Sequence, residues 1–284
     1  MIVDIHTHFW SQKEDLDDCV ERDVIHAGAS PAMLDITPEK YAAGTAGADR
    51  AVVFGLRANN TGFHISNDRV ARFVASDSKR LIGFGSADPH PKLGDADPLR
   101  EVQRCTDELG MRGVKLGPTY QGVAPDDERL MKIYAYAEKK GLPVLFHQGT
   151  TFARNAPLKF ANPVLLEDIA YRFPELRMIV AHMGHPWIGE CISLIRKQPH
   201  VYADVSALHY RPFQFYNALK LAEEYNAHRK LLFGTDFPFT TVAASLDALR
   251  NMNTYAARYN LPPIAGSVIE DLIHRDSLSL LNLA

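Results

Sequence analysis

Two histidines close to the start of the chain, His6 and His8, have the spacing of a metal-binding pair on a β-strand. The β-branched residues at positions 2, 3 and 5 favour extended structure, and successive side chains of a strand point to opposite faces. Asp4, His6 and His8 are therefore expected on one face, where the two imidazoles can point at a common cation. A chance pair on a polar edge strand is the alternative interpretation of so short a motif.

Further polar residues follow apolar, strand-like segments in later parts of the chain. They are Lys115, His147, His182 and Asp236. If these segments are neighbouring strands, the polar groups meet at one rim, and burying them together is costly unless they share a partner. The partner we expect is a divalent cation, held by three neutral imidazoles and one carboxylate.

Strand-like and helix-like segments alternate along the chain. We expect strands at residues 2–8, 51–56, 81–87, 113–116, 143–147, 177–182, 201–206 and 231–235, with a helix after each. The clearest helix spans residues 126–140, with acidic residues in its first turn, lysines in its last turn and Gly141 after it. This order predicts an α/β fold, a (β/α)8 TIM barrel in one domain over residues 1–284, with extra C-terminal helices at 262–281 packed outside it. A doubly wound open sheet is the alternative, but no Gly-rich dinucleotide loop follows the first strand.

The segment from residue 9 to residue 36 is polar and rich in Asp and Glu. We expect a long loop there, and a loop of that length is uncommon without a function. It either covers a site or is a mobile surface excursion. The residues that follow, Thr37 and Pro38, have the pattern of an N-cap and a first helical residue.

Composition narrows the classes of function. The 284 residues include 46% hydrophobic and 23% charged residues, as in a globular protein with a sizeable core. The 31 basic and 34 acidic residues are spread along the chain without a long basic run, which argues against a nucleic-acid partner. No apolar stretch approaches the roughly 20 residues of a membrane span, and the first residues do not resemble a secretory signal. Three cysteines without C-x-x-C spacing favour a reduced, cytoplasmic chain, and a homo-oligomer is left open.

Four motifs together resemble the amidohydrolase superfamily. They are D-x-H-x-H at residues 4–8, L-F-H-Q-G at 145–149, A-H-M-G-H-P at 181–186 and F-G-T-D-F-P at 233–238. More narrowly, they resemble its TIM-barrel metal-dependent hydrolases, the branch that includes aminocarboxymuconate-semialdehyde decarboxylase, resorcylate-type decarboxylases and pyrone-dicarboxylate lactonase. The resemblance runs from residue 1 to about residue 238 and is weaker in the C-terminal helices.

The resemblance implies a single divalent cation, Zn²⁺ or in second place Mn²⁺, bound by His6, His8, His147 and Asp236. It also implies that His182 contacts a metal-bound water rather than the metal. A metal lowers the pKa of its bound water towards roughly 7, which makes hydroxide available at neutral pH. We expect Asp236 and His182 to be catalytic, Asp236 by accepting the proton of that water and His182 by orienting the water or polarising the substrate.

Cationic residues on the same rim are candidate substrate contacts. Lys115 lies on the fourth strand, where binuclear amidohydrolases carry a carboxylated lysine that bridges two metals; a contact to a substrate anion and a plain salt bridge are the alternatives. The loop residues expected to face the same mouth and to bind a substrate carboxylate are Arg57, Arg154, His209 and Arg211. We therefore expect a small, anionic substrate. Asp4, one layer below the histidines, is expected to support them rather than to bind the metal.

The main hypothesis for function is a metal-dependent hydrolase that attacks a small carboxylic ester, lactone or amide with metal-activated water. The alternative is a metal-dependent, non-oxidative decarboxylase (carboxy-lyase) of an aromatic or muconate-like acid, which uses the same ligands. A metal-dependent deoxyribonuclease is a weaker hypothesis. Those enzymes have a G-E-x-G-L-D pattern on the fourth strand, and residues 113–117 of this chain lack its glutamate. A barrel that only binds ligands is disfavoured because every proposed metal ligand is present.

Overall fold

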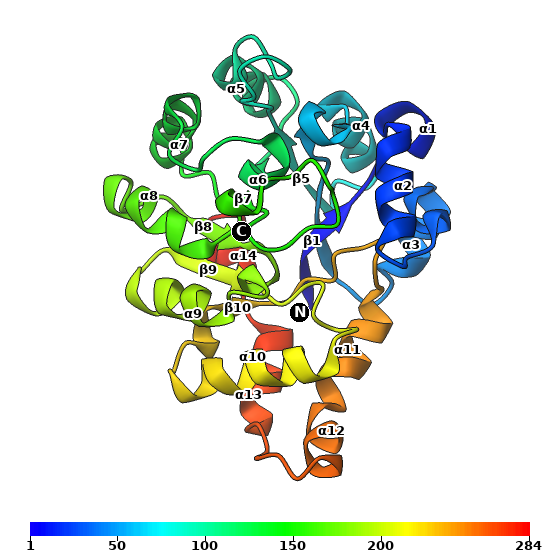
Figure 1. The fold of residues 1–284 in the computed structure, drawn as a ribbon, viewed down its shortest axis with the longest axis vertical. Coiled ribbons are helices and arrows are strands. Elements are labelled where there is room, and N and C mark those ends of the chain that lie inside the picture. The colour runs from blue at the N-terminus through cyan, green and yellow to red at the C-terminus, as the bar shows by residue number, and fades with distance from the viewer.

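Eight parallel strands form the central sheet of the protein, and the computed structural model describes residues 1–284. In chain order the strands are β1 (Val3–His8), β2 (Arg50–Phe54), β5 (Leu81–Ser86), β6 (Gly113–Leu116), β7 (Val144–Phe146), β8 (Met178–Val180), β9 (Val201–Asp204) and β10 (Leu231–Leu232). Each strand pairs with the next one in this series, and the sheet curves into a nearly closed barrel (Figure 1). The predicted TIM barrel is therefore confirmed.

The barrel closes along a seam between β1 and the segment that follows β10. The main-chain N–H of Ile5 donates to the carbonyl of Phe233 at 3.1 Å, and the N–H of Asp236 donates to the carbonyl of His6 at 2.8 Å. β10 is shorter than predicted because the residues after Leu232 bond to β1 through such single contacts rather than through a regular ladder. The seam brings the end of the eighth strand beside the two histidines of the first.

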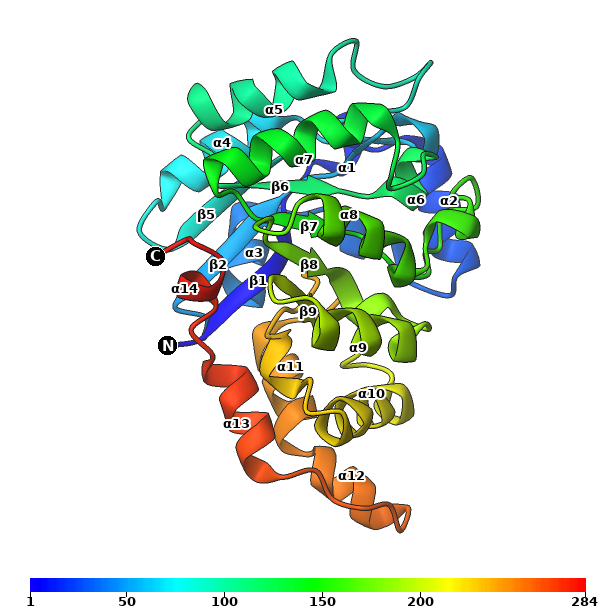
Figure 2. The same cartoon turned by 90° about the vertical axis from the view of Figure 1, so that its left-hand side faces the viewer.

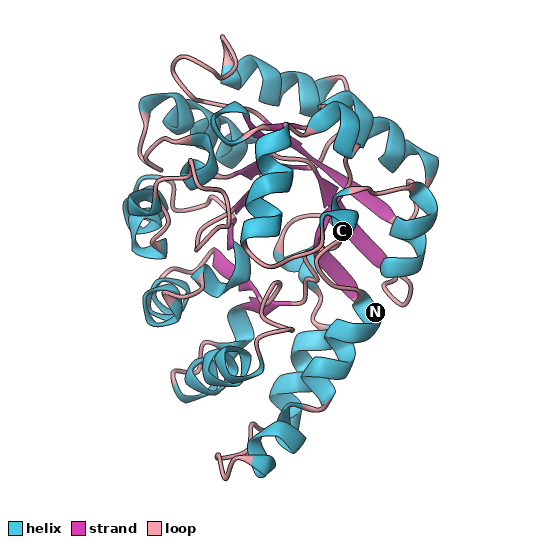
Figure 3. Ribbon diagram, turned by 45° about the vertical axis from the view of Figure 1, so that its right-hand side comes forward, coloured by secondary structure: helices cyan, strands magenta, loops and turns pink.

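A helix follows each barrel strand and packs outside the sheet (Figures 1 and 3). These helices are α3 (Pro38–Gly44), α4 (Asn67–Ser76), α5 (Pro98–Asp107), α7 (Glu128–Lys140), α8 (Glu167–Arg172), α9 (Ile188–Lys197), α10 (Pro212–Glu224) and α11 (Val242–Arg250). The side chains of Thr37, Asp97 and Asp127 accept hydrogen bonds from first-turn N–H groups, and Gly141 ends α7 in a left-handed conformation. No helix of the protein is long and apolar enough to cross a membrane.

The chain finishes in three short helices, α12 (Met252–Arg258), α13 (Gly266–His274) and α14 (Ser277–Leu280). Figure 2 shows α13, which lies within the predicted range 262–281, beside the barrel, and α14 at the end where β1 begins. The helix α12, which was not predicted, packs against α10 and α11. Leu278 and Leu281 are buried in one apolar cluster with strand residues such as Val3 and Val52. The guanidinium of Arg112, just before β6, donates to the main-chain carbonyl of Leu283 at 2.9 Å. The expected external position is therefore wrong for α14, whose leucines close the floor of the barrel.

The segment between β1 and α3 is not the loop that its composition suggests. It contains α1 (Gln12–Asp15), α2 (Asp18–His26) and a 3-10 turn over residues 31–34. α2 buries Val20 and Val24, which lie one helical turn apart, while most of its other residues are polar. The indole N–H of Trp10 donates to the carbonyl of Leu34 at 2.6 Å and so ties the start of the segment to its end.

Candidate metal centre

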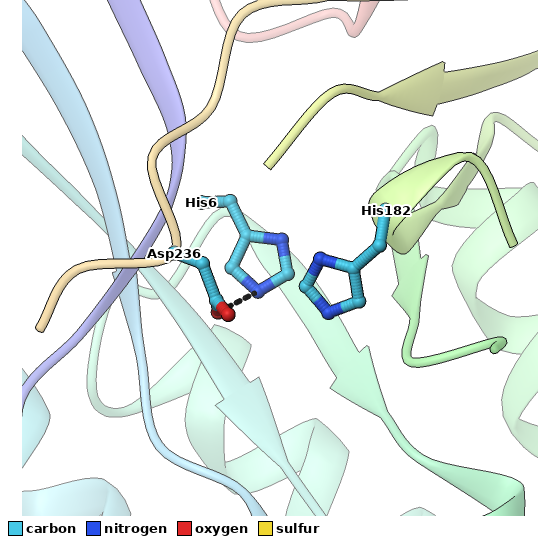
Figure 4. Close-up of side chains that lie close together, drawn as sticks. All are labelled: His6, His182 and Asp236. Atoms are coloured by element: carbon cyan, nitrogen blue, oxygen red, sulfur yellow. Dashed lines mark ion pairs between the residues drawn. The ribbon is translucent and has the colours of Figure 1, made fainter. Parts of the chain in front are cut away.

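Three groups that can bind a cation meet where the barrel strands end. His6 lies on β1, His182 in the turn after β8, and Asp236 after β10 (Figure 4). One ligand atom from each lies within 4.8 Å of the other two, and all three residues are buried. Nε2 of His6 is 3.2 Å from Oδ1 of Asp236. Two imidazoles and a carboxylate in this arrangement form a candidate site for one divalent ion.

The other two predicted ligands, His8 and His147, adjoin this group. Nε2 of His8 is 3.1 Å from Oδ1 of Asp236, and the ring centroid of His147 is 5.0 Å from that of His182. Nε2 of His147 donates to the carbonyl of Thr150 at 3.1 Å, so Nδ1 is the ring nitrogen left to bind a cation. The structure thus brings the predicted ligands together with His182. The resemblance implied that His182 contacts a metal-bound water and not the metal itself. Which of them bind the metal stays a prediction.

A β-bulge in β1 changes the expected position of Asp4. Asp4 pairs with Ala51 of β2 and His8 pairs with Phe54, so five residues of β1 lie opposite four of β2. The two side chains therefore point to opposite faces, and the expectation that Asp4 shares the face of the histidines is wrong. Asp4 instead accepts hydrogen bonds from the main-chain N–H and the hydroxyl of Thr235, at 3.0 and 2.7 Å. It supports the site by holding the seam rather than by orienting an imidazole.

Several residues at the site have backbone conformations that are costly for side chains other than glycine. The φ angle is +58° at His182, +66° at Asp236 and +56° at Ala207. Each conformation of this kind costs on the order of 1–3 kcal/mol, and such positions cluster at functional sites. The N–H of His182 is held by the carboxylate of Asp204 at 2.9 Å, which helps to keep its ring facing the other ligands.

Several buried nitrogen atoms in this group have no hydrogen-bond partner. They include Nε2 of His6, Nδ1 of His8 and Nζ of Lys115. Most buried polar atoms in proteins are satisfied, so a cluster of exceptions is typical of a ligand site. A divalent cation suits the imidazole nitrogens because each offers a lone pair. The residues present therefore fit a bound metal ion.

Burial sets the protonation of the histidines. It lowers the pKa of both His8 and His182 to about 4, and that of His147 well below its ordinary value. These three rings are therefore neutral at pH 7, the form that binds metals. Burial also opposes the charge on His6, but the carboxylate of Asp204 outweighs it and raises the pKa of His6.

Asp236 and Lys115 are two further ionisable groups at this site. Burial would raise the pKa of Asp236, but the nearby His182 and His6 hold it well below its ordinary value, so the group is a carboxylate at neutral pH. Burial lowers the pKa of Lys115 to about 7. Its Nζ lies 4.6 Å from the ring centroid of Phe54 and is not paired with a carboxylate. The plain salt bridge considered for Lys115 is therefore not formed.

Sequence reasoning missed two residues behind the histidines, Asp204 and Ser206. Oδ2 of Asp204 is 2.8 Å from Nδ1 of His6, and Oγ of Ser206 is 2.7 Å from Nδ1 of His182. Both residues are fully buried. They follow an apolar run over residues 201–203, the same signal that identified the other rim residues.

A cavity of about 560 Å³, a size typical of small-molecule sites, opens onto the candidate metal site. Its polar end is formed by His8, Lys115, His147, His182 and Asp236. Its other walls include Trp10, Ala27, Ala29, Met33, Phe63, Phe152 and Phe239. Four of these wall residues belong to the segment over residues 9–36, so this segment covers one side of the site. The sequence left open whether this segment covers a site or is a mobile surface excursion, and the structure agrees with the first.

Two of the five predicted substrate contacts, Lys115 and Arg211, line the cavity. Arg211 follows β9, and its guanidinium donates to the carbonyl of Ala207 and lies 4.5 Å from the ring centroid of Tyr210. The stacked guanidinium keeps further N–H groups that can bind a carboxylate. The cavity therefore carries one cation at its polar end and a second on a loop.

The structure does not bring the other three predicted contacts to the cavity. The guanidinium of Arg57 pairs with Asp95, with Nε 3.3 Å from Oδ2, and so is turned to a neighbouring loop. Arg154 is exposed. His209 is buried behind the wall, where its Nε2 donates to the carbonyl of Gly234 at 2.9 Å. These placements correct the expectation that Arg57, Arg154 and His209 face the substrate.

Known proteins resemble this chain in sequence and in fold. A curated relative, 2-amino-3-carboxymuconate-6-semialdehyde decarboxylase of Dictyostelium discoideum, is 26% identical over 201 residues. The match covers 61% of this chain and 55% of the relative, so the chain spans about half the length of that protein. The structure of 5-carboxyvanillate decarboxylase from Sphingomonas paucimobilis superposes with a TM-score of 0.71 at 16% identity, covering 100% of this chain and 99% of that one.

A third similar protein carries a metal. The dihydroxybenzoic acid decarboxylase of a Polaromonas species was solved with bound manganese and the inhibitor 2-nitroresorcinol. It superposes with a TM-score of 0.67 at 15% identity and covers 99% of this chain and 97% of its own. At these identities the structural matches establish the fold. Residues 3–265 match the sequence profile of the amidohydrolases, which covers most of the chain, and the protein therefore belongs to the amidohydrolase family.

Proposed function

We propose that the protein is a metal-dependent, non-oxidative decarboxylase of a small aromatic or muconate-like carboxylic acid. The observation that carries the proposal is the position of His8, His147, His182 and Asp236, which lie with Lys115 at the polar end of a cavity with largely apolar and aromatic walls. A flat acid fits this arrangement with its carboxylate at the polar end and its unsaturated carbons between the walls. The decarboxylase activities named for the similar proteins support the same choice.

The reaction breaks the bond between the carboxylate and its neighbouring carbon, releases CO₂ and puts a proton on that carbon. A bound divalent cation would act as a Lewis acid that holds the carboxylate and an adjacent oxygen of the substrate. Asp236 lines the cavity as a carboxylate, so it can take a proton from water or a hydroxyl group and return it to the reacting carbon. Lys115 places a cation or an N–H donor beside the same oxygens.

The hydrolysis of an ester, lactone or amide, which the sequence favoured first, has less support. The curated relative from Dictyostelium discoideum is named as a decarboxylase, and so are the proteins of the two similar structures. Manganese is the first ion to test because it is bound in the dihydroxybenzoic acid decarboxylase, and zinc is the second because of its affinity for histidine.

The decisive experiment measures both reactions on one preparation. Purified protein is freed of metal, loaded with Mn²⁺ or Zn²⁺, and offered dihydroxybenzoates, 5-carboxyvanillate and a muconate semialdehyde, with CO₂ release as the readout. A parallel panel contains lactones, amides and esters. We expect CO₂ release that depends on the metal and is lost in His6→Ala. Hydrolysis of the second panel without any CO₂ from the first would reject the proposal.

A further inference from the structure

The two histidines drawn in Figure 4, His6 and His182, are joined by a continuous hydrogen-bond path through Asp204 and Ser206. Nδ1 of His182 is 2.7 Å from Oγ of Ser206, and that Oγ is in short contact with Oδ1 of Asp204. The other carboxylate oxygen, Oδ2, is 2.8 Å from Nδ1 of His6. All four residues are buried, so water does not replace a bond that the path fails to make.

The number of protons available along this path determines which group donates and which accepts in each hydrogen bond. Asp204 is surrounded by donors, because Oδ1 also accepts the main-chain N–H groups of His182 and Ser206 at 2.9 and 3.0 Å. A carboxylate only accepts hydrogen bonds, so the short contact between Oδ1 and Oγ requires the hydroxyl proton of Ser206. That hydroxyl has one proton, and Oγ must therefore accept from His182. Nδ1 of His182 consequently carries the ring proton.

The opposite arrangement leaves one of the two short contacts of the Ser206 hydroxyl without a proton. If His182 carried its proton on Nε2, the single proton of Ser206 would face two acceptors, Nδ1 of His182 and Oδ1 of Asp204. The same argument applies to His6, whose Nδ1 faces the acceptor-only Oδ2 and must donate to it. One carboxylate thus determines the proton position on two rings that come from different strands.

We propose that Asp204 and Ser206 are positioning residues that hold His6 and His182 as Nδ1–H tautomers. Each ring then offers the Nε2 lone pair to the site, and His182 acts as a ligand atom or a proton acceptor rather than as a proton donor. This positioning role rests on one part of the proposed function, the binding of a divalent cation at the site, and does not depend on decarboxylation. Fixing the tautomer through the second ring nitrogen is a known way to orient a metal-binding histidine.

The first test observes the tautomers directly in the Zn²⁺-loaded protein. Long-range ¹H–¹⁵N spectra of the imidazoles distinguish an Nδ1–H ring from an Nε2–H ring, and the spectra of His6→Asn and His182→Asn assign the signals. We expect both rings to be Nδ1–H in the wild type. Oγ of Ser206 is also 3.2 Å from Nδ1 of His6, but that ring keeps the carboxylate of Asp204 as a partner. Ser206→Ala should therefore disturb the signal of His182 more than that of His6, and Ser206→Thr, which keeps the hydroxyl, should restore both. An Nε2–H signal for His182 in the wild type would overturn the proposal.

The second test measures metal affinity by competition with a chelator of known affinity. Asp204→Asn should weaken Zn²⁺ and Mn²⁺ binding roughly 10–100-fold, the usual effect of removing such a partner. Two variants control for the loss of a buried polar group elsewhere. Asp88→Asn alters a buried carboxylate that caps the backbone outside the cavity, and Ser245→Ala removes a buried hydroxyl that has no partner.

The outcomes distinguish the positioning role of Asp204 and Ser206 from the decarboxylase activity. Wild-type affinity in Asp204→Asn, or an equal loss in Asp88→Asn, would refute the positioning role. If Asp204→Asn does not fold, the comparison of Ser206→Ala with Ser206→Thr still decides the tautomer of His182. A wild-type protein that binds metal but releases no CO₂ would reject the decarboxylase and leave the tautomer result unaffected.

Discussion

Replacing the buried Lys115 by methionine should stabilise the metal-free protein at neutral pH. The residue is 1% exposed, its Nζ has no hydrogen-bond partner, and burial lowers its pKa from 10.5 to about 7. At about 1.4 kcal/mol per pH unit, this difference corresponds to a cost of roughly 4 kcal/mol at pH 7. Methionine has a similar length and no charge, so Lys115→Met should recover most of that free energy of unfolding.

The free-energy cost of burying Lys115 decreases as the pH rises. Because the pKa of Lys115 is lower in the folded state, the unfolded chain binds more protons between pH 7 and 10.5. The folded wild type therefore gains stability as the pH rises through this range, and the cost is fully present only below pH 7. Between pH 7 and pH 9 the wild type should gain about 2 kcal/mol relative to the variant.

Urea unfolding of the chelator-treated proteins at pH 7 and pH 9 measures both effects. The exposed Lys79, replaced by methionine, is the matched control and should change neither the stability nor its pH dependence. Equal pH dependence in the wild type and in Lys115→Met would refute the reasoning, because it would mean that the lysine titrates alike in the folded and unfolded states.

Other predictions concern the metal, the proton transfer, the barrel floor and the corrected substrate contacts. Removing the divalent cation should abolish CO₂ release and lower the Tm, and Mn²⁺ should restore both, since a ligand of the folded state stabilises it; calorimetry and the CO₂ assay check this. Asp236→Asn should reduce kcat roughly 10²–10⁴-fold by removing the proton acceptor, as measured with Mn²⁺ at saturation. Leu281→Ala should lower the free energy of unfolding by roughly 2–5 kcal/mol in urea without changing KM, because it opens a gap in the floor. Arg57→Ala should leave KM unchanged, because that guanidinium pairs with Asp95 outside the cavity; a large rise in KM would contradict its placement.

The rim residues were predictable because the signal for them is local. His147, His182 and Asp236 each follow an apolar run, and a closed barrel gives such strand ends a single rim on which to meet. Asp204 follows a run of the same kind, but its function depends on His6, which is 198 positions away. The face of Asp4 was predicted wrongly because a bulge depends on how two strands pair and not on the alternation within one.

Elements whose packing partner is distant in the chain were predicted less well. The helix α2 was missed because only Val20 and Val24 form its buried stripe, and its polar composition resembles that of a loop. The helix α14 was expected, but leucine spacing does not say whether a helix packs on the side of a barrel or across its floor. Arg57 was expected at the mouth because it follows a strand, and nothing in its neighbourhood pointed to a pairing with Asp95.

Candidate ligands lie on both sides of the seam that closes the barrel, with His6 and His8 on β1 and Asp236 on the opposite segment. An ion bound by both sides would hold them together, so local opening of the barrel and release of the ion would become one coupled event. The amide protons of Ile5, His8 and Asp236 form hydrogen bonds across this seam. Their exchange with deuterium should therefore slow on metal loading more than that of amides between β5 and β6.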